Sequence, residues 1–468
     1  MMHPSRILLC ILSTFVVLAA ACALFAGKSE VVRVPSLASV LGFPTESSEP
    51  SVPSELSEFT EPSELSESPE TSEPSAPADT VIPIDTTPAK PKVVELPKSL
   101  PQTRLNLPLF YAALSQADRQ TVRVVHFGDS QIEEDRISMI LRRRLQERFG
   151  GGGIGLIPMV QTIPSCTAKQ GLEQNGNPLP NSSIKRYVSY GLASMRMKDD
   201  NRYGPMAQVA YIEQPVDVTV ELRRDRVPTN DFSQVRILCS DSVTVTIAPD
   251  SVPAQLHLIP LDEPRHNLLL HFGGKGYVYG ISLETPTGVQ VDNIPMRGAA
   301  GTNFTTMSRE LFADYFRETN TALIIMQFGG NALPAIRTQA AVEKYVVSMR
   351  QQILFMMSAA PNASLLFIGP SDMITVVDGE QQTYPMLPLL DRQLAAMITE
   401  EGGAYYSLFR LMGGAGSMVS WRDKGLAGED MIHFTRAGAK KVGEMLAKQL
   451  LEDYDSMNEP VLNDSIAQ

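Results

Sequence analysis

The chain has 468 residues, more than one ordinary domain needs, and a formal net charge of −12 at pH 7. That charge argues against nucleic acid as a partner, because phosphate binding depends on an excess of Lys and Arg. Most of the negative charge is concentrated in residues 34–89, which contain nine Glu, two Asp and no Lys or Arg. The rest of the chain is therefore close to neutral.

Residues 1–28 are typical of a targeting segment. Arg6 precedes an apolar run, residues 7–26, which at about 20 residues is long enough to span a bilayer and somewhat long for a cleaved signal peptide. An uncleaved anchor, a cleaved signal peptide and a lipoprotein signal ending at Cys22 all stay open. Each of them predicts export of the rest of the chain, with the membrane as a partner of the N-terminal segment.

Residues 29–95 have the composition of a disordered linker. Ser, Glu and Pro dominate, and Glu recurs at every third position from Glu55 to Glu73. In a polyproline II helix, with three residues per turn, these carboxylates would form one stripe. Such a segment cannot bury enough apolar surface to fold. We therefore expect a solvated spacer, with a specific ligand for a basic partner as the alternative.

Helices and strands are predicted to alternate on either side of a different central region. The first part is residues 96–155, and the second is residues 297–456, followed by a C-terminal tail, residues 457–468. Predicted strands cover residues 122–127, 322–328, 365–368 and 404–407; predicted helices cover residues 107–117, 133–149, 305–318, 340–357, 386–400 and 436–454. This alternation predicts an α/β fold with a doubly wound parallel sheet.

Residues 156–296 instead contain short β-rich runs separated by turn residues, which predicts an inserted antiparallel β-sandwich. The runs are residues 206–211, 216–222, 235–238, 243–248, 255–258, 268–272, 277–283 and 289–291. Tyr277 and Tyr279 either stack on sugar rings or are ordinary sheet residues. Cys166 and Cys239 either pair in an oxidising compartment or stay as buried thiols.

Three separate blocks supply the groups of a serine esterase. Ser130 follows the first strand, where ligands bind in doubly wound folds. His433 can act as its base, and Asp430, three residues earlier, can orient the imidazole ring. For the oxyanion hole we expect the Ser130 and Gly301 backbone N–H groups and the Asn331 amide, with Gly298 as the alternative to Gly301. No metal and no organic cofactor is expected.

These blocks resemble the SGNH (GDSL) hydrolase family, which is named after its Ser, Gly, Asn and His residues. The matching segments are Gly128-Asp129-Ser130, Gly298-Ala299-Ala300-Gly301, Phe328-Gly329-Gly330-Asn331 and Asp430-Met431-Ile432-His433-Phe434-Thr435. The resemblance implies a flavodoxin-like fold. Gln131 and Ala332 depart from the residues common at their positions. Neither departure removes a catalytic group, and both are candidates for tuning substrate choice.

The segment His126-Phe127-Gly128-Asp129-Ser130 and the Gly-rich stop after residues 141–149 resemble the branch that contains bacterial peptidoglycan O-acetylesterases. In that branch a β-sandwich similar to carbohydrate-binding modules lies between the first two blocks. The resemblance implies an esterase that removes acetyl groups from peptidoglycan or another polysaccharide. It also implies a place in the bacterial cell envelope, on the periplasmic side of the inner membrane or exported.

Two other functions are compatible with the same residues. An O-acetyltransferase would use the same triad, with a sugar hydroxyl in place of water as the acyl acceptor. A membrane-tethered glycan-binding protein with a vestigial site would rely on the β insertion alone, but the complete set of Ser130, His433 and Asp430 argues against it.

Overall fold

The computed structural model describes residues 104–191, 195–197, 201–224, 230–247 and 258–458, all within the compact unit Glu95–Gln468. The predicted targeting segment, the predicted linker and most of the C-terminal tail lie outside the described residues. Within the described ranges, no helix is both long and apolar enough to cross a membrane. The domain boundaries given above stay predictions.

The predicted parallel sheet is confirmed. It has five strands in the order β13-β1-β14-β15-β18, and every neighbouring pair is parallel. Their bounds are β1 (Thr121–Gly128), β13 (Gly288–Pro295), β14 (Thr321–Gln327), β15 (Ser364–Ile368) and β18 (Ala404–Tyr406). Since β1 has β13 on one side and β14 on the other, the carboxyl end of β1 is a point where the strand order reverses. Ligands bind at such points in open α/β sheets.

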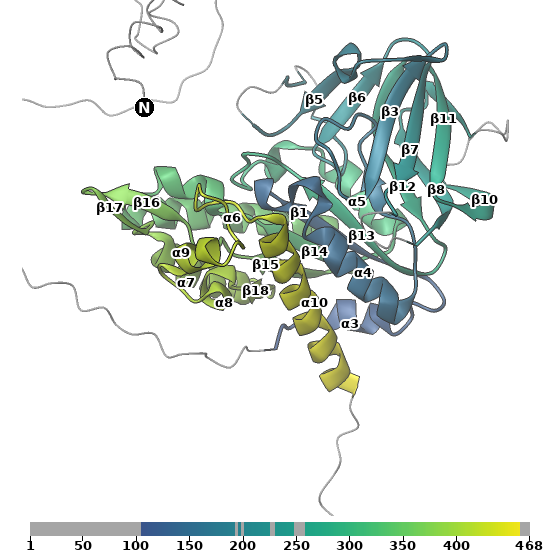
Figure 1. Cartoon of the computed structure of the whole chain (residues 1–468). Coiled ribbons are helices and arrows are strands. Elements are labelled where there is room, and N and C mark those ends of the chain that lie inside the picture. Colours follow the sequence, from purple (N-terminus) through teal and green to yellow (C-terminus); the bar gives the residue numbers. More distant parts are fainter. Residues whose placement is uncertain (1–103, 192–194, 198–200, 225–229, 248–257, 459–468) are drawn as a thin grey trace, which may run out of the picture. The chain divides into compact units, whose positions relative to one another are not determined.

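Helices cover both faces of this sheet. Successive strand residues therefore alternate between two separate hydrophobic cores. On β1, Val124 belongs to one core, while Val125 belongs to the other. The Val124 core includes residues of α3 (Pro108–Leu114), α4 (Ser138–Phe149), α8 (Leu408–Met412), α9 (Ser417–Asp423) and α10 (Arg436–Asn458). The Val125 core includes residues of α5 (Arg309–Glu318), α6 (Gln339–Ala359) and α7 (Leu387–Glu400). Figure 1 shows α4 and α10 side by side.

Most of the predicted antiparallel strands are also present, although residues 255–257 of the predicted strand 255–258 lie outside the described residues. The described residues between α4 and β13 form two antiparallel sheets. One has the order β10-β8-β12-β6-β5, with β2 also paired to β12, and the other has the order β4-β3-β7-β11-β9. The bounds are β2 (Gly155–Ile157), β3 (Ala168–Gln174), β4 (Asn177–Pro178), β5 (Lys185–Val188), β6 (Gln208–Ile212), β7 (Val216–Leu222), β8 (Phe232–Cys239), β9 (Val243–Ile247), β10 (Leu258–Arg265), β11 (Asn267–Gly274) and β12 (Gly276–Glu284). Apolar residues of both sheets share a third core.

One strand was assigned to the wrong sheet by its pattern. Residues 289–291 were expected in the antiparallel insertion, but they lie in β13, which pairs in parallel with β1. The sequence of β13 alternates apolar and polar residues, as a half-exposed antiparallel strand does. Here the polar residues Gln290 and Asp292 are fully buried instead. The partners of Asp292, which are Arg123, Tyr315 and the Leu156 N–H, come from distant segments, so the local pattern could not reveal its burial.

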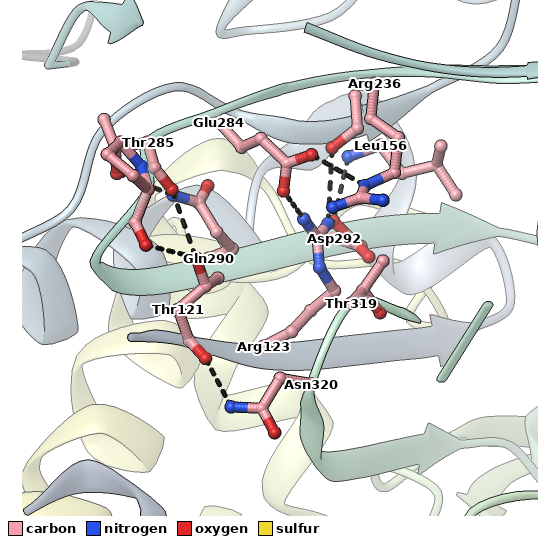
Figure 2. Close-up of polar contacts among 12 residues, drawn as sticks. Thr121, Arg123, Leu156, Arg236, Glu284, Thr285, Gln290, Asp292, Thr319 and Asn320 are labelled. Atoms are coloured by element: carbon pink, nitrogen blue, oxygen red, sulfur yellow. Dashed lines mark hydrogen bonds and ion pairs between the residues drawn. The ribbon is translucent and has the colours of Figure 1, made fainter. Parts of the chain in front are cut away.

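A buried ionic network joins the parallel sheet to the antiparallel strands (Figure 2). Arg123 on β1 is fully buried and bonds Asp292 on β13 at 2.7 Å and Glu284 on β12. Arg236 on β8 binds the other oxygen of Glu284 at 2.9 Å, and Tyr315 on α5 donates a 2.5 Å bond to Asp292. Burial lowers the pKa of Arg123, but the facing acidic groups raise it by more, so the guanidinium stays charged. The positive charges of the two arginines thus balance the negative charges of the two carboxylates where the parallel sheet meets the antiparallel strands.

Candidate active site

Ser130 lies at the carboxyl end of β1, where the chain turns into the 3₁₀ helix η1 (Ser130–Asp135). Asp129 caps this helix, since its carboxylate accepts a 2.9 Å hydrogen bond from the Gln131 backbone N–H. Asp129 is buried, and burial raises its pKa to about 6. The cap holds the Ser130 side chain at the sheet edge, and Ser130 itself is half-buried.

The structure brings the three predicted triad residues together. Ser130 Oγ lies 2.8 Å from His433 Nε2, and His433 Nδ1 lies 2.7 Å from Asp430 Oδ2. These contacts form a chain of nucleophile, base and orienting carboxylate at hydrogen-bond distance, which is the arrangement that activates a serine hydroxyl.

The Asp430 carboxylate also shapes the loop that carries the histidine. Its Oδ1 accepts hydrogen bonds from the backbone N–H groups of Ile432 and His433, each at 3.0 Å. Partial burial raises the pKa of Asp430, but the hydrogen bonds from His433 and Ile432 lower it by more. The net pKa therefore lies below its usual value, and the carboxylate is ionised at neutral pH. An ionised partner favours the Nδ1–H tautomer, which leaves Nε2 as the acceptor facing Ser130.

A cavity of about 180 Å³ opens beside Ser130 and His433. Much of its wall is apolar, and the residues that line it are Asp129, Ser130, Gln131, Gln327, Phe328, Gly330, Asn331, Pro334, Gly369, Pro370, Ser371, Met373, Ile432 and His433. The wall is built from segments that follow β1, β14 and β15, together with the histidine loop. A small acyl group fits such a space.

Asn331 lines this cavity from η4 (Gly330–Ala335), directly after β14. Its side-chain amide donates a 3.2 Å hydrogen bond to the Ala299 carbonyl. An amide nitrogen carries two hydrogens, so this bond orients the group without using all its donor capacity. Asn331 is therefore positioned as the sequence predicts for an oxyanion donor, and the role itself stays a prediction.

Gly298 and Gly301, the two glycines of the second sequence block, are less closely connected to the cavity than Asn331. Among the described residues that line it, neither Gly301 nor Gly298 is present. Gly301 has a φ of +79°, and a Cβ there would lie 2.6 Å from Cγ of Phe328. Close packing against a cavity-wall residue therefore explains why this position is Gly. Its predicted role as an oxyanion donor is not tested by this contact.

The helix after the nucleophile begins later than predicted. Residues 133–135 were expected in its first turn, but α4 begins at Ser138, and Glu134 and Asp135 have φ values of +60° and +65°. The Asp135 carboxylate instead forms bonds of 2.7 and 3.1 Å with buried Arg142. This ion pair fixes a conformation that non-Gly residues rarely adopt, and such local strain is common near functional sites.

Other candidate groups have structural roles. His126 is fully buried between Gln327 and Ser138, and burial lowers its pKa to about 4, so it is neutral and distinct from the base of the triad. Cys166 and Cys239 are both free, which favours the thiol interpretation over a disulfide. In the part of the chain that the structure describes, no group of three or more His, Cys, Asp or Glu side chains could hold a metal ion.

Tyr277 and Tyr279 on β12 were the predicted candidates for stacking on sugar rings. Both are half-buried and pack against the core that also includes Phe127 of β1. Their rings contact each other, and that of Tyr277 also contacts Tyr211. This packing favours the interpretation that they are ordinary sheet residues.

No protein-family model matches the chain, and no curated protein sequence matches it significantly. Among solved structures, a peptidoglycan O-acetylesterase matches with a TM-score of 0.61 and 19% identity, over 75% of this chain and 96% of that chain. A family two carbohydrate esterase from Cellvibrio japonicus matches with a TM-score of 0.26 and 10% identity, over 62% of this chain and 99% of that chain. An acetyl xylan esterase matches with a TM-score of 0.27 and 10% identity, over 35% of this chain and 80% of that chain.

The first of these matches spans nearly all of the solved chain. At 19% identity it establishes the fold and leaves the reaction to be argued from the site. The chain therefore shares its fold with a peptidoglycan O-acetylesterase, and the resemblance predicted from the sequence is confirmed at the level of the fold.

Proposed function

We propose that this protein is an exported serine esterase of the SGNH type that removes O-acetyl groups from peptidoglycan or another polysaccharide. The observation that carries the proposal is the chain of contacts from Ser130 through His433 to Asp430 beside a small cavity. The shared fold with a peptidoglycan O-acetylesterase supports the choice of substrate class.

In the proposed reaction, Ser130 Oγ attacks the acetyl carbonyl while His433 Nε2 takes its proton. Asp430 holds the imidazole ring and stabilises the imidazolium that forms. The Asn331 amide and the backbone N–H groups of Ser130 and Gly301 bind the negative oxygen of the tetrahedral intermediate. The bond from the acyl carbon to the sugar oxygen then breaks, His433 gives its proton to that oxygen, and the acetyl group stays on Ser130. In the second half of the cycle, His433 deprotonates a water molecule that attacks the acyl carbonyl. The bond from the acyl carbon to Ser130 Oγ then breaks, His433 returns the proton to Ser130 Oγ, and acetate leaves.

The cavity supports a short acyl group. Its volume of about 180 Å³ leaves room for an acetyl group, and its wall of Phe328, Pro334 and Met373 suits the acetyl methyl group. The sugar part of the substrate would remain outside, toward the open side of the cavity. The predicted membrane segment and spacer would place such a catalyst near the cell wall in the envelope.

The proposal is tested with a soluble fragment from residue 96 onward, assayed on a chromogenic acetyl ester, a chromogenic octanoyl ester and O-acetylated peptidoglycan. We expect turnover of the acetyl ester and release of acetate from the polymer, with weak turnover of the octanoyl ester. Ser130→Ala is the matched inactive control. If no ester is cleaved, the proposal is wrong, and the glycan-binding alternative gains support.

The same assay separates the esterase from the O-acetyltransferase. Both share the acyl-enzyme step, so the acetyl ester is turned over in either case. Adding a chitooligosaccharide acceptor and measuring its acetylation distinguishes them. An esterase releases free acetate whether or not the acceptor is present, whereas a transferase acetylates the acceptor.

A further inference from the structure

Gln131, the residue after the nucleophile, binds the backbone on both sides of His433. Its Nε2 donates a 2.7 Å hydrogen bond to the Ile432 carbonyl, and its Oε1 accepts a 3.3 Å hydrogen bond from the Phe434 N–H. Gln131 is 8% exposed; its bond with the Phe434 N–H is buried, and its bond with the Ile432 carbonyl is partly buried.

The Arg136 guanidinium reinforces this connection. It donates hydrogen bonds to the carbonyls of Ser130 at 2.6 Å, Gln131 at 3.0 Å and Phe434 at 3.2 Å. The turn that carries the nucleophile and the loop that carries the base are therefore joined by side chains that bind backbone groups of both.

The bond between Asp430 and His433 cannot supply this connection. Those residues are three positions apart on one loop, so their contact orients the ring within the loop. It does not determine how far the loop lies from Ser130. Gln131 can determine this distance, because its backbone belongs to the turn that carries Ser130 and its side chain bonds the backbone of the histidine loop.

We infer that Gln131 is a positioning residue that sets the distance between Ser130 Oγ and His433 Nε2. This inference rests on the proposed esterase function. The role requires a donor and an acceptor on one uncharged side chain of this length, which is the chemistry of the glutamine amide. Because the amide is already bonded to backbone groups, its removal affects the reaction rate more than substrate affinity.

The first test compares Gln131→Leu with the wild-type enzyme on the chromogenic acetyl ester. We expect kcat to fall about 10²-fold, the size expected of a small misplacement of reacting groups, with KM nearly unchanged. The matched control is Gln146→Leu, since Gln146 is also buried and donates to the carbonyls of Gly153 and Val289, and none of these three residues lines the cavity. We expect the control to lower the melting temperature and leave kcat unchanged.

The second test uses Gln131→Glu and does not depend on the folding of the leucine variant. When its carboxyl group is ionised it cannot donate to the Ile432 carbonyl, but when protonated it can, while its other oxygen still accepts from Phe434. We therefore expect the ratio of variant to wild-type kcat to rise as the pH falls.

Three results would overturn the inference. They are a raised KM with unchanged kcat in Gln131→Leu, an equal loss of kcat in Gln146→Leu, and a pH-independent ratio for Gln131→Glu. The first would make Gln131 a substrate contact, and the second would indicate a general packing effect. Absence of turnover by the wild-type enzyme is a different outcome, because it would refute the proposed esterase function itself and the inference with it.

Discussion

Replacing Asp430 with Asn keeps the shape of the side chain and changes one hydrogen-bond partner of His433. In the present structure, Asp430 Oδ1 accepts two backbone N–H groups, from Ile432 and His433, and Oδ2 accepts one ring N–H. An amide has only one oxygen, so the substituted side chain can satisfy the two backbone donors or the ring donor, but not both.

The count of bonds decides which orientation the amide adopts. With its oxygen toward the backbone, the amide retains the two hydrogen bonds from the Ile432 and His433 N–H groups. With its oxygen toward the ring, it retains only the hydrogen bond from the His433 ring, and its own N–H groups face the two backbone N–H donors. Each hydrogen bond contributes about 0.5–1.5 kcal/mol, so the first orientation is favoured. The amide N–H then faces His433 Nδ1, which becomes an acceptor, and the ring proton moves to Nε2.

That tautomer presents a donor to Ser130 Oγ, and it cannot take the serine proton. The expected loss in kcat is about 10⁴-fold, the size seen when a triad carboxylate is replaced by an amide without loss of geometry. The loss corresponds to about 5.4 kcal/mol of transition-state stabilisation. KM should change little, because the cavity wall is untouched.

The assay is steady-state hydrolysis of the chromogenic acetyl ester, with thermal unfolding to establish that the variant is folded. Asp423→Asn is the matched control, since Asp423 is an exposed aspartate at the end of α9 that pairs with Arg422 outside the cavity. We expect this control to retain wild-type kcat. If Asp430→Asn keeps more than about a tenth of the wild-type kcat, the tautomer argument is wrong.

Three further predictions follow from the same geometry. Ser130→Ala and His433→Ala should each abolish ester cleavage without unfolding the protein. The double variant should be little less active than either single variant, because the two residues act as one unit. Clear turnover by Ser130→Ala would exclude Ser130 as the nucleophile. Asn331→Ala should lower kcat about 10²–10³-fold, as expected for one oxyanion donor, and a raised KM with constant kcat would indicate a binding residue instead. Arg123→Leu should lower the free energy of unfolding by about 3–5 kcal/mol, because Asp292 stays buried without its cation. An unchanged denaturation midpoint would show that the hydrogen bonds from Tyr315 and the Leu156 N–H are enough to stabilise the buried Asp292 carboxylate.

The alternation of helices and strands could be predicted because it depends on local patterns. Strands β14 and β15 are continuous apolar runs, and the long helices have apolar faces at helical spacing. The positions of Ser130 and Asn331 follow from the same patterns, since both come directly after such runs. The closeness of Asp430 and His433 could be predicted from a spacing of three residues within one loop.

Other features depend on partners far away in the sequence, and only the tertiary structure decided them. Strand β13 has the pattern of a half-exposed strand, and its buried Asp292 is accounted for by the positions of Arg123, Tyr315 and the Leu156 N–H. The segment after Ser130 has the pattern of a helix start, but the Asp135 carboxylate bonds Arg142 on α4 and accepts a 2.8 Å hydrogen bond from Thr167, which is 32 positions away.

Gln131 is the clearest example of this division. From the sequence alone, it differs from the family pattern beside the nucleophile and could equally face substrate. In the structure its amide meets backbone groups more than 300 positions away, on both sides of His433. The sequence by itself therefore determined which chemical groups are present and in which local elements they lie. The tertiary structure decided which of them act together, because hydrogen bonds and ion pairs between distant segments depend on how the elements pack and not on the spacing of residues along the chain.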